Sequence, residues 1–267
     1  MFFKEVDDMD AKKMPVVFSG HGSPMLALED TAVTKGLRDL GEQIIEKYGK
    51  PKAILAVSAH WYTRGTYVQS EEAPKQIYDM YGFPKELYDF KYPARGCPEL
   101  TDRILTLLGD RVSVNDEWGI DHGTWTVLCH VFPAADIPVV QLSVDGTINE
   151  DEIYEIGKSL APLREEGYLI FASGNIVHNL RCVEWDNPNG SLEYIAFNDA
   201  ITGYVLDRND RVVMDYSAVP NASYAVPTPE HYLPLIYILG ASEGEKPTVF
   251  NNHCELGAIA MTGYIFG

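Results

Sequence analysis

The chain has 267 residues, with 39 acidic and 21 basic side chains and a formal charge of −18 at pH 7. Apolar residues make up 46% of it, the usual share for a folded protein, which excludes a disordered chain. Binding to nucleic acid needs clustered lysine and arginine, and the longest basic cluster here is Lys12-Lys13, beside an acidic segment. We therefore expect no nucleic-acid partner.

The sequence contains no segment typical of export or membrane insertion. No stretch approaches the roughly 20 apolar residues that cross a bilayer. The segment MFFKEVDDMDAKK carries acidic residues where a secretory signal has a basic end and an apolar run. The four cysteines lie far apart and form no CxxC pair of the kind found in zinc or redox sites. We expect a cytoplasmic protein with reduced cysteines that does not bind a membrane.

Short apolar runs rich in β-branched residues alternate with amphipathic stretches, which is typical of parallel strands connected by helices. We expect strands at residues 15–18, 53–57, 66–68, 112–114, 137–144, 168–172 and 258–265. We expect helices at residues 30–49, with Asp30 as N-cap, and at 98–108, 149–165, 190–208 and 229–240, the last one marked by Thr228-Pro229-Glu230. No repeat or composition break divides the chain. The pattern predicts a single α/β domain over residues 1–267, with a central, mostly parallel sheet flanked by helices.

Residues 71–97, which we call the aromatic loop, lack a regular period. Aromatic residues, prolines and glycines crowd together in this segment. A long irregular segment in a compact domain is often a functional loop or a lid. Two interpretations stay open, a cover over a flat ring or an ordinary hydrophobic cluster packed under the loop. The aromatic residues concerned are Tyr78, Tyr81, Phe83, Tyr88, Phe90 and Tyr92.

Three histidines come at or just after predicted strands. His21 follows the first strand in SGHGSP, His60 ends the second in AVSAHW, and His178 follows YLIFA in SGNIVHN. In an open α/β sheet, ligands bind beyond the carboxyl ends of parallel strands. Imidazole is the commonest metal ligand and is well suited to proton transfer near neutral pH. This placement predicts a metal or catalytic site at one edge of the sheet.

Two further histidines could face the same cleft. His122 lies in IDHGTW, before an apolar segment predicted to begin a helix, and His231 lies in the first turn of the helix that starts TPEHYLPL. Glu230 competes with His231 as a metal ligand, because a rotation of that helix by one position would replace the imidazole with the carboxylate. His130 is expected to be packed and His253 to hydrogen-bond a turn.

The chain resembles the LigB-type class III extradiol ring-cleaving dioxygenases and, within them, the 4,5-DOPA extradiol dioxygenase group. The resemblance is carried by GHGSP at 20–24, SAHW at 58–61, YGFPKELYDFKYPARG at 81–96, DHGTW at 121–125, SGNIVHNL at 173–180 and PEHYLPL at 229–235. These segments occur in the family's order and extend over nearly the whole chain. The resemblance implies a LigB-like α/β domain and an oxidoreductase that inserts O2 into the ring of a small, DOPA-like catechol to give a ring-opened semialdehyde.

The resemblance also implies a role for each histidine of the predicted site. His21, His60 and His231 would bind a single metal ion, with His178 beside them as acid/base or as a possible fourth ligand, and His122 would act in the substrate pocket. The wider superfamily usually has glutamate where this chain has His231. Iron(II) is expected in the active enzyme, and a histidine-only site also suits zinc(II).

Two other functions are compatible with the same residues. One is a zinc-dependent hydrolase in which a metal-bound hydroxide attacks and His178 is the acid/base. The other is a non-catalytic binding protein of the same fold. A DOPA-like substrate also needs a partner for its carboxylate, and Arg95 and Arg181 are candidates.

Overall fold

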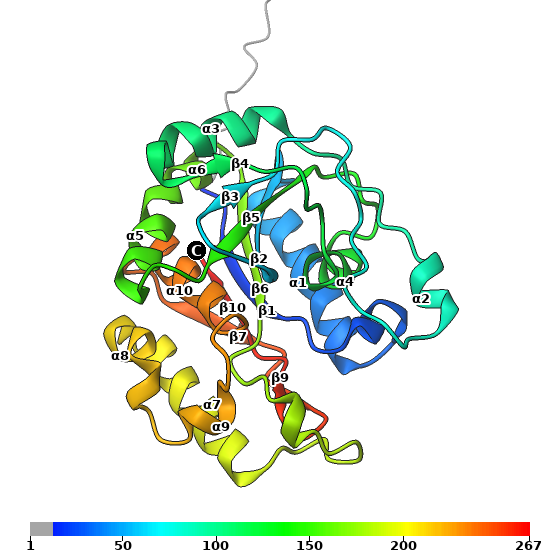
Figure 1. Cartoon of the computed structure of the whole chain (residues 1–267), viewed down its shortest axis with the longest axis vertical. Coiled ribbons are helices and arrows are strands. Elements are labelled where there is room, and N and C mark those ends of the chain that lie inside the picture. Colours follow the sequence, from blue (N-terminus) through cyan, green and yellow to red (C-terminus); the bar gives the residue numbers. More distant parts are fainter. Residues whose placement is uncertain (1–12) are drawn as a thin grey trace, which may run out of the picture.

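The computed structural model describes residues 13–267, within which eight strands form one sheet (Figure 1). Their order is β4 (Ser113–Val114), β3 (Tyr67–Val68), β5 (Val139–Asp145), β2 (Ile54–Thr63), β6 (Leu169–Gly174), β1 (Val16–Gly20), β10 (Gly263–Phe266) and β7 (Pro247–Phe250). Strands β5, β2, β6 and β1 run parallel, whereas β3 against β5, β10 against β1, and β7 against β10 are antiparallel. This confirms the predicted mostly parallel sheet.

Helices cover both faces of the sheet. On one side lie α1 (Ala32–Tyr48) and α4 (His122–Val131), and on the other lie α3 (Pro98–Leu108), α5 (Glu150–Leu160), α7 (Leu192–Leu206) and α10 (Leu233–Ala241) (Figure 1). The shorter elements are α2 (Lys85–Asp89), α6 (Pro162–Glu165), α8 (Asp210–Met214), α9 (Ala222–Ala225), η1 (Pro24–Leu28), η2 (Gly109–Arg111), η3 (Leu180–Cys182), η4 (Tyr216–Ala218), and the ribbon of β8 (Cys254–Glu255) and β9 (Ile259–Ala260).

Alternate residues of each central strand belong to opposite cores. In β1, Val16 and Phe18 pack with α5 and α10, whereas Val17 packs with α1 and α4. In β2, Leu55 and Ile54 divide in the same way. Because helices cover both faces, these strands read as continuous apolar runs rather than as alternating ones.

Two of the predicted helix starts and one predicted helix were wrong. The N-cap of α1 is Thr31 rather than Asp30, because Thr31 Oγ1 accepts a hydrogen bond from the Thr34 N–H at 3.4 Å and Thr34 Oγ1 accepts one from the Thr31 N–H at 2.9 Å. The helix expected over 149–165 breaks into α5 and α6 before Pro162, which lacks an N–H to continue the ladder.

The last of these corrections concerns the segment that carries His231. Helix α10 begins at Leu233 rather than at Pro229, since Pro234 cannot donate a hydrogen bond to the preceding turn. The carbonyl of His231 instead accepts a hydrogen bond from the Asn175 N–H at 2.8 Å, just beyond β6. His231 is therefore fixed against the end of the sheet by a turn and not by the first turn of a helix.

The expectation of no secretory signal falls mainly on residues 1–12, which lie outside the described residues. Among residues 13–267, no helix combines the length and the apolar character needed to cross a bilayer.

Helices α5 and α10 touch backbone to backbone through two glycines. A Cβ atom added at Gly240 would lie 2.1 Å from the carbonyl oxygen of Tyr154, and one added at Gly157 would lie 2.1 Å from that of Tyr237. This close approach fixes α10 against α5 on one face of the sheet.

Replacing Gly240 with alanine should destabilise the protein. Alanine favours a helix by about 1 kcal/mol over glycine, but here its methyl group would overlap a backbone oxygen, and such overpacking costs about 1–3 kcal/mol. Gly203→Ala is the matched control, because a Cβ at Gly203 of α7 meets open space. Urea unfolding should give a lower midpoint for Gly240→Ala and an equal or higher one for Gly203→Ala. Equal midpoints for wild type and Gly240→Ala would contradict the close packing.

Candidate metal centre

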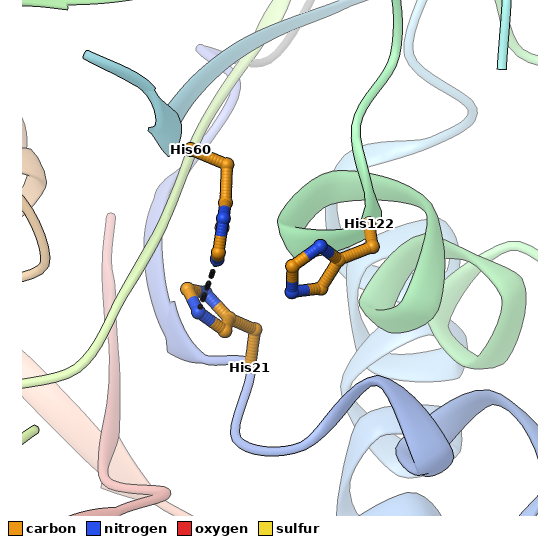
Figure 2. A group of neighbouring side chains, drawn as sticks. All are labelled: His21, His60 and His122. Atoms are coloured by element: carbon orange, nitrogen blue, oxygen red, sulfur yellow. Dashed lines mark hydrogen bonds between the residues drawn. The ribbon is translucent and has the colours of Figure 1, made fainter. Parts of the chain in front are cut away.

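Five histidines from distant parts of the chain meet at the carboxyl edge of the parallel strands. His21 follows β1, His60 lies near the end of β2, and His178 follows β6, which lies between those two strands. His231 comes from the turn before α10, and His122 is the first residue of α4. Figure 2 shows His21, His60 and His122 converging from the end of β1, from β2 and from α4.

The ring positions define two overlapping sets of three. The ring centroids of His21, His60 and His231 form a nearly equal-sided triangle, with separations of 4.9, 5.2 and 5.1 Å. His122 lies 3.9 Å from His60 and 6.0 Å from His21, and one ligand nitrogen from each of these three residues lies within 4.8 Å of the others. His178 stacks on His231, with centroids 3.6 Å apart and planes 8° apart.

The Nδ1 atoms of His21 and His231 both have an acceptor. His21 Nδ1 lies 2.8 Å from Ser173 Oγ, which in turn donates to the carbonyl oxygen of Gly123, so the serine accepts from the imidazole. His231 Nδ1 lies 3.2 Å from Glu230 Oε1. A neutral imidazole carries one N–H. These contacts place it on Nδ1 and leave the lone pair on Nε2.

Asp79 accepts hydrogen bonds from the Nδ1 atoms of two histidines, His60 and His122. Its Oδ2 lies 2.9 Å from His60 Nδ1, and its Oδ1 lies 2.9 Å from His122 Nδ1. Burial raises the pKa of the Asp79 carboxyl, but the hydrogen bonds from His122 and His60 outweigh it and hold that pKa far below its usual range. The carboxylate can only accept, so both imidazoles donate from Nδ1.

The Nε2 side of these rings is buried and short of donors. His21 Nε2 lies 3.2 Å from His60 Nε2, along the dashed line of Figure 2. His231 Nε2 is buried without a hydrogen-bond partner among the described residues. Buried acceptors are normally satisfied, and a cation that prefers imidazole nitrogen would satisfy all three. The residues therefore fit a single metal ion bound through Nε2.

Burial keeps most of these imidazoles neutral. It lowers the pKa of His21 well below its ordinary value and that of His231 to about 4, and it lowers the pKa of His178 to about 2 with help from neighbouring imidazoles. His60 differs: burial is the largest single effect and lowers its pKa, but the Asp79 hydrogen bond together with the charges of Asp121, Asp79 and Glu230 outweighs burial and raises that pKa. Neutral imidazole is the form that binds metals.

Asp121 fixes the start of α4 and was missed by the sequence reasoning. Its buried carboxylate accepts hydrogen bonds from the Thr124 N–H at 3.3 Å, from Ser58 Oγ at 2.7 Å and from Trp118 Nε1 at 3.1 Å. An aspartate just before a helix is a readable N-cap pattern. Its hydrogen bond from Ser58 of β2 depends on the tertiary fold and has no sequence signal.

Most of the aromatic loop packs as a hydrophobic cluster. Tyr78 and Phe90 lie against Trp125 of α4, with ring centroids 5.6 and 5.7 Å apart, and Tyr92 is buried. Tyr81 is 93% exposed. These contacts fit the interpretation of an ordinary hydrophobic cluster packed under the loop. Sequence reasoning missed that the same loop carries Asp79, since nothing in the local pattern marks that residue.

The remaining candidates lie apart from the Nε2 cluster. Glu230 contacts the Nδ1 atom of His231 rather than standing in its place. Arg95 and Arg181 are both exposed, and a guanidinium nitrogen of Arg95 lies 3.7 Å from Glu72 Oε2. His130, expected to be packed, is half-buried, and its Nε2 atom lies 2.8 Å from the carbonyl oxygen of Leu26. His253, expected to bond a turn, is exposed.

Comparison with known proteins identifies the family. Residues 15–267 match the family described as the catalytic LigB subunit of aromatic ring-opening dioxygenase. A protein of Escherichia coli K12 named 4,5-DOPA dioxygenase extradiol is 42% identical over 97% of both chains. One of the same name from Beta vulgaris is 37% identical, over 93% of this chain and 95% of its own.

A solved structure is also similar. The crystal structure of an uncharacterized protein of Escherichia coli K12 superposes with a TM-score of 0.82 at 39% identity, covering 95% of this chain and all of that one. The fold class and the family resemblance are thereby confirmed. The chain belongs to the LigB family and is an extradiol aromatic-ring-opening oxidoreductase.

Proposed function

We propose that this enzyme uses iron(II), bound by His21, His60 and His231, to insert O2 into the ring of a small DOPA-like catechol and give a ring-opened semialdehyde. The observation that carries the ligand set is the triangle of imidazole rings with separations of 4.9, 5.2 and 5.1 Å. The DOPA-like substrate follows from the names of the relatives.

The three rings are nearly evenly spaced around one point, so His21, His60 and His231 could hold a single ion through their Nε2 atoms. The ligand atoms of His21, His60 and His122 also lie within 4.8 Å of one another, but their ring centroids are less evenly spaced, at 3.9, 4.9 and 6.0 Å, and the Nε2 atom of His231 is the one left buried without a partner among the described residues. His122 is therefore assigned to the substrate pocket.

Iron(II) would supply a redox-active ion with vacant positions, which zinc(II) does not. His178 acts as the base. Its ring lies parallel to that of His231 at 3.6 Å, beside the proposed ligands. With its pKa lowered to about 2, this neutral imidazole would hold a catechol proton only briefly before returning it. His122 holds the substrate through Nε2, because its Nδ1 is committed to Asp79.

We also propose where the enzyme is located and how its chain is organised. We place the enzyme in the cytoplasm, where its cysteines, all unpaired among the described residues, would stay reduced. We treat residues 1–267 as one catalytic domain, since the match to the family extends over residues 15–267.

Iron(II) should support ring opening and zinc(II) should not. After anaerobic loading with iron(II), adding O2 and DOPA should give a yellow ring-opened product and consume one O2 per catechol. His21→Ala, treated identically, is the control and should give none. Turnover of an ester or amide by the zinc form, without product from the iron form, would favour the hydrolase and contradict the proposal.

His231→Ala should abolish metal retention, since it removes a proposed ligand. Glu230→Gln should weaken binding by no more than about 10- to 100-fold, the usual effect of a residue that orients a ligand. Equilibrium dialysis against zinc(II) measures both, with the exposed His253→Ala as control. Loss of the metal in Glu230→Gln but not in His231→Ala would mean that the carboxylate is the ligand.

His178→Ala should lower kcat by about 10²- to 10⁴-fold, as expected for loss of a general base. Metal content should not change, because the ligand triangle is intact. Stopped-flow kinetics and elemental analysis of the same sample make the comparison. A parallel fall in metal content would show that His178 is a fourth ligand rather than the base.

A further inference from the structure

We propose that Asp79 is the positioning residue of the metal centre: a single carboxylate fixes the tautomer and the relative orientation of the ligand His60 and the pocket histidine His122. The inference rests on the proposed function, because it takes His60 as a metal ligand. It assigns the aromatic loop a role beyond packing, since that loop carries the carboxylate.

The contacts of Asp79 use both of its oxygens. Oδ2 lies 2.9 Å from His60 Nδ1, and Oδ1 lies 2.9 Å from His122 Nδ1 and 3.2 Å from the backbone nitrogen of His122. The Asp79 side chain is 14% exposed, and those of His60 and His122 are 19% and 6% exposed. The two rings lie 3.9 Å apart at an interplanar angle of 53°. One carboxylate thus sets where both rings stand.

The chemistry of a carboxylate fixes the tautomer as well as the place. An ionised carboxylate accepts hydrogen bonds and donates none, so each imidazole must carry its hydrogen on Nδ1. His60 and His122 then both present a lone pair at Nε2. His60 can bind a metal only with that lone pair, and His122 can accept a substrate hydroxyl only with it.

The loop around Asp79 is anchored to the same helix that carries His122. The Ile77 N–H donates to the Ile120 carbonyl at 2.8 Å, and Trp125 Nε1 of α4 donates to the Ile77 carbonyl at 3.0 Å. Tyr78 Oη donates to the Phe90 carbonyl at 2.6 Å. The aromatic packing therefore serves to hold one carboxylate in register with two histidines from β2 and α4.

The first test measures tautomers in the wild-type protein without metal. Two-bond ¹H–¹⁵N correlations of the imidazole rings, recorded at a pH high enough to keep His60 neutral and assigned with His60→Gln and His122→Gln, should show the Nδ1–H tautomer for both residues. The Nε2–H tautomer at either residue would overturn the proposal. This measurement needs no active enzyme and no variant of Asp79.

The second test is Asp79→Asn. The amide has one acceptor, so one of the two rings must shift its hydrogen to Nε2. We expect zinc(II) affinity, measured by competition with a chelator, to fall by about 10- to 100-fold, and one ring to change tautomer. The urea midpoint should stay close to that of wild type. Asp89→Asn is the matched control, because that residue of α2 is 60% exposed and makes the same change in charge.

Failure of this proposal can be told apart from failure of the proposed function. If wild type binds zinc(II) and Asp79→Asn binds it equally well with both tautomers kept, Asp79 is not a positioning residue, whereas the ligand set survives. If wild type itself does not bind metal through these histidines, the proposed function fails, and the tautomers measured without metal still decide the role of Asp79.

Discussion

The proposed centre depends on hydrogen bonds that run outward from imidazole Nδ1 atoms to buried acceptors. Ser173, Asp79 and Glu230 supply these acceptors. A neutral imidazole has a single N–H, so giving it to an outer acceptor turns the lone pair inward. The three rings come from distant segments, and without these acceptors nothing would decide which nitrogen each one presents. The acceptors, more than the histidines themselves, make a common coordination point.

The register of the parallel strands brings the acceptors and the proposed ligands together. In the sheet, Ser173 of β6 pairs with Ser19 of β1 on one side and with Ser58 of β2 on the other. His21 and His60 lie two residues beyond those partners, at the carboxyl edge. Ser173 therefore sits between the two ligand-bearing strands, and its hydroxyl reaches His21 at 2.8 Å. This part of the proposed site, His21 with Ser173 and His60 beside them, follows from the register of the sheet alone.

How far the sequence could predict this arrangement differs from residue to residue. The positions of His21, His60 and His178 could be predicted because apolar strands mark where the sheet ends. The turn that holds His231 could not, because it depends on Pro234 interrupting a helix and on a carbonyl bonded to Asn175.

Two other features stayed hidden for related reasons. Strand β7 was missed because Pro247–Phe250 is a short, half-exposed run at the edge of the sheet, with too few apolar residues to stand out. Asp79 gives no local pattern at all. Its proposed role depends on aromatic side chains around it that pack on α4, a tertiary contact that periodicity does not report.

The same acceptors explain how the proposed ligand set of three histidines could be buried. Three neutral imidazoles leave a divalent ion with its full formal charge, and an isolated charge in a low-dielectric interior is costly. Here the negative charge lies on carboxylates that contact the Nδ1 atoms of the proposed ligands, Asp79 at His60 and Glu230 at His231. These carboxylates compensate part of that cost through polarised imidazoles without occupying a coordination position. A directly bound glutamate would instead reduce the formal charge by one, and would weaken the attraction for an anionic catecholate.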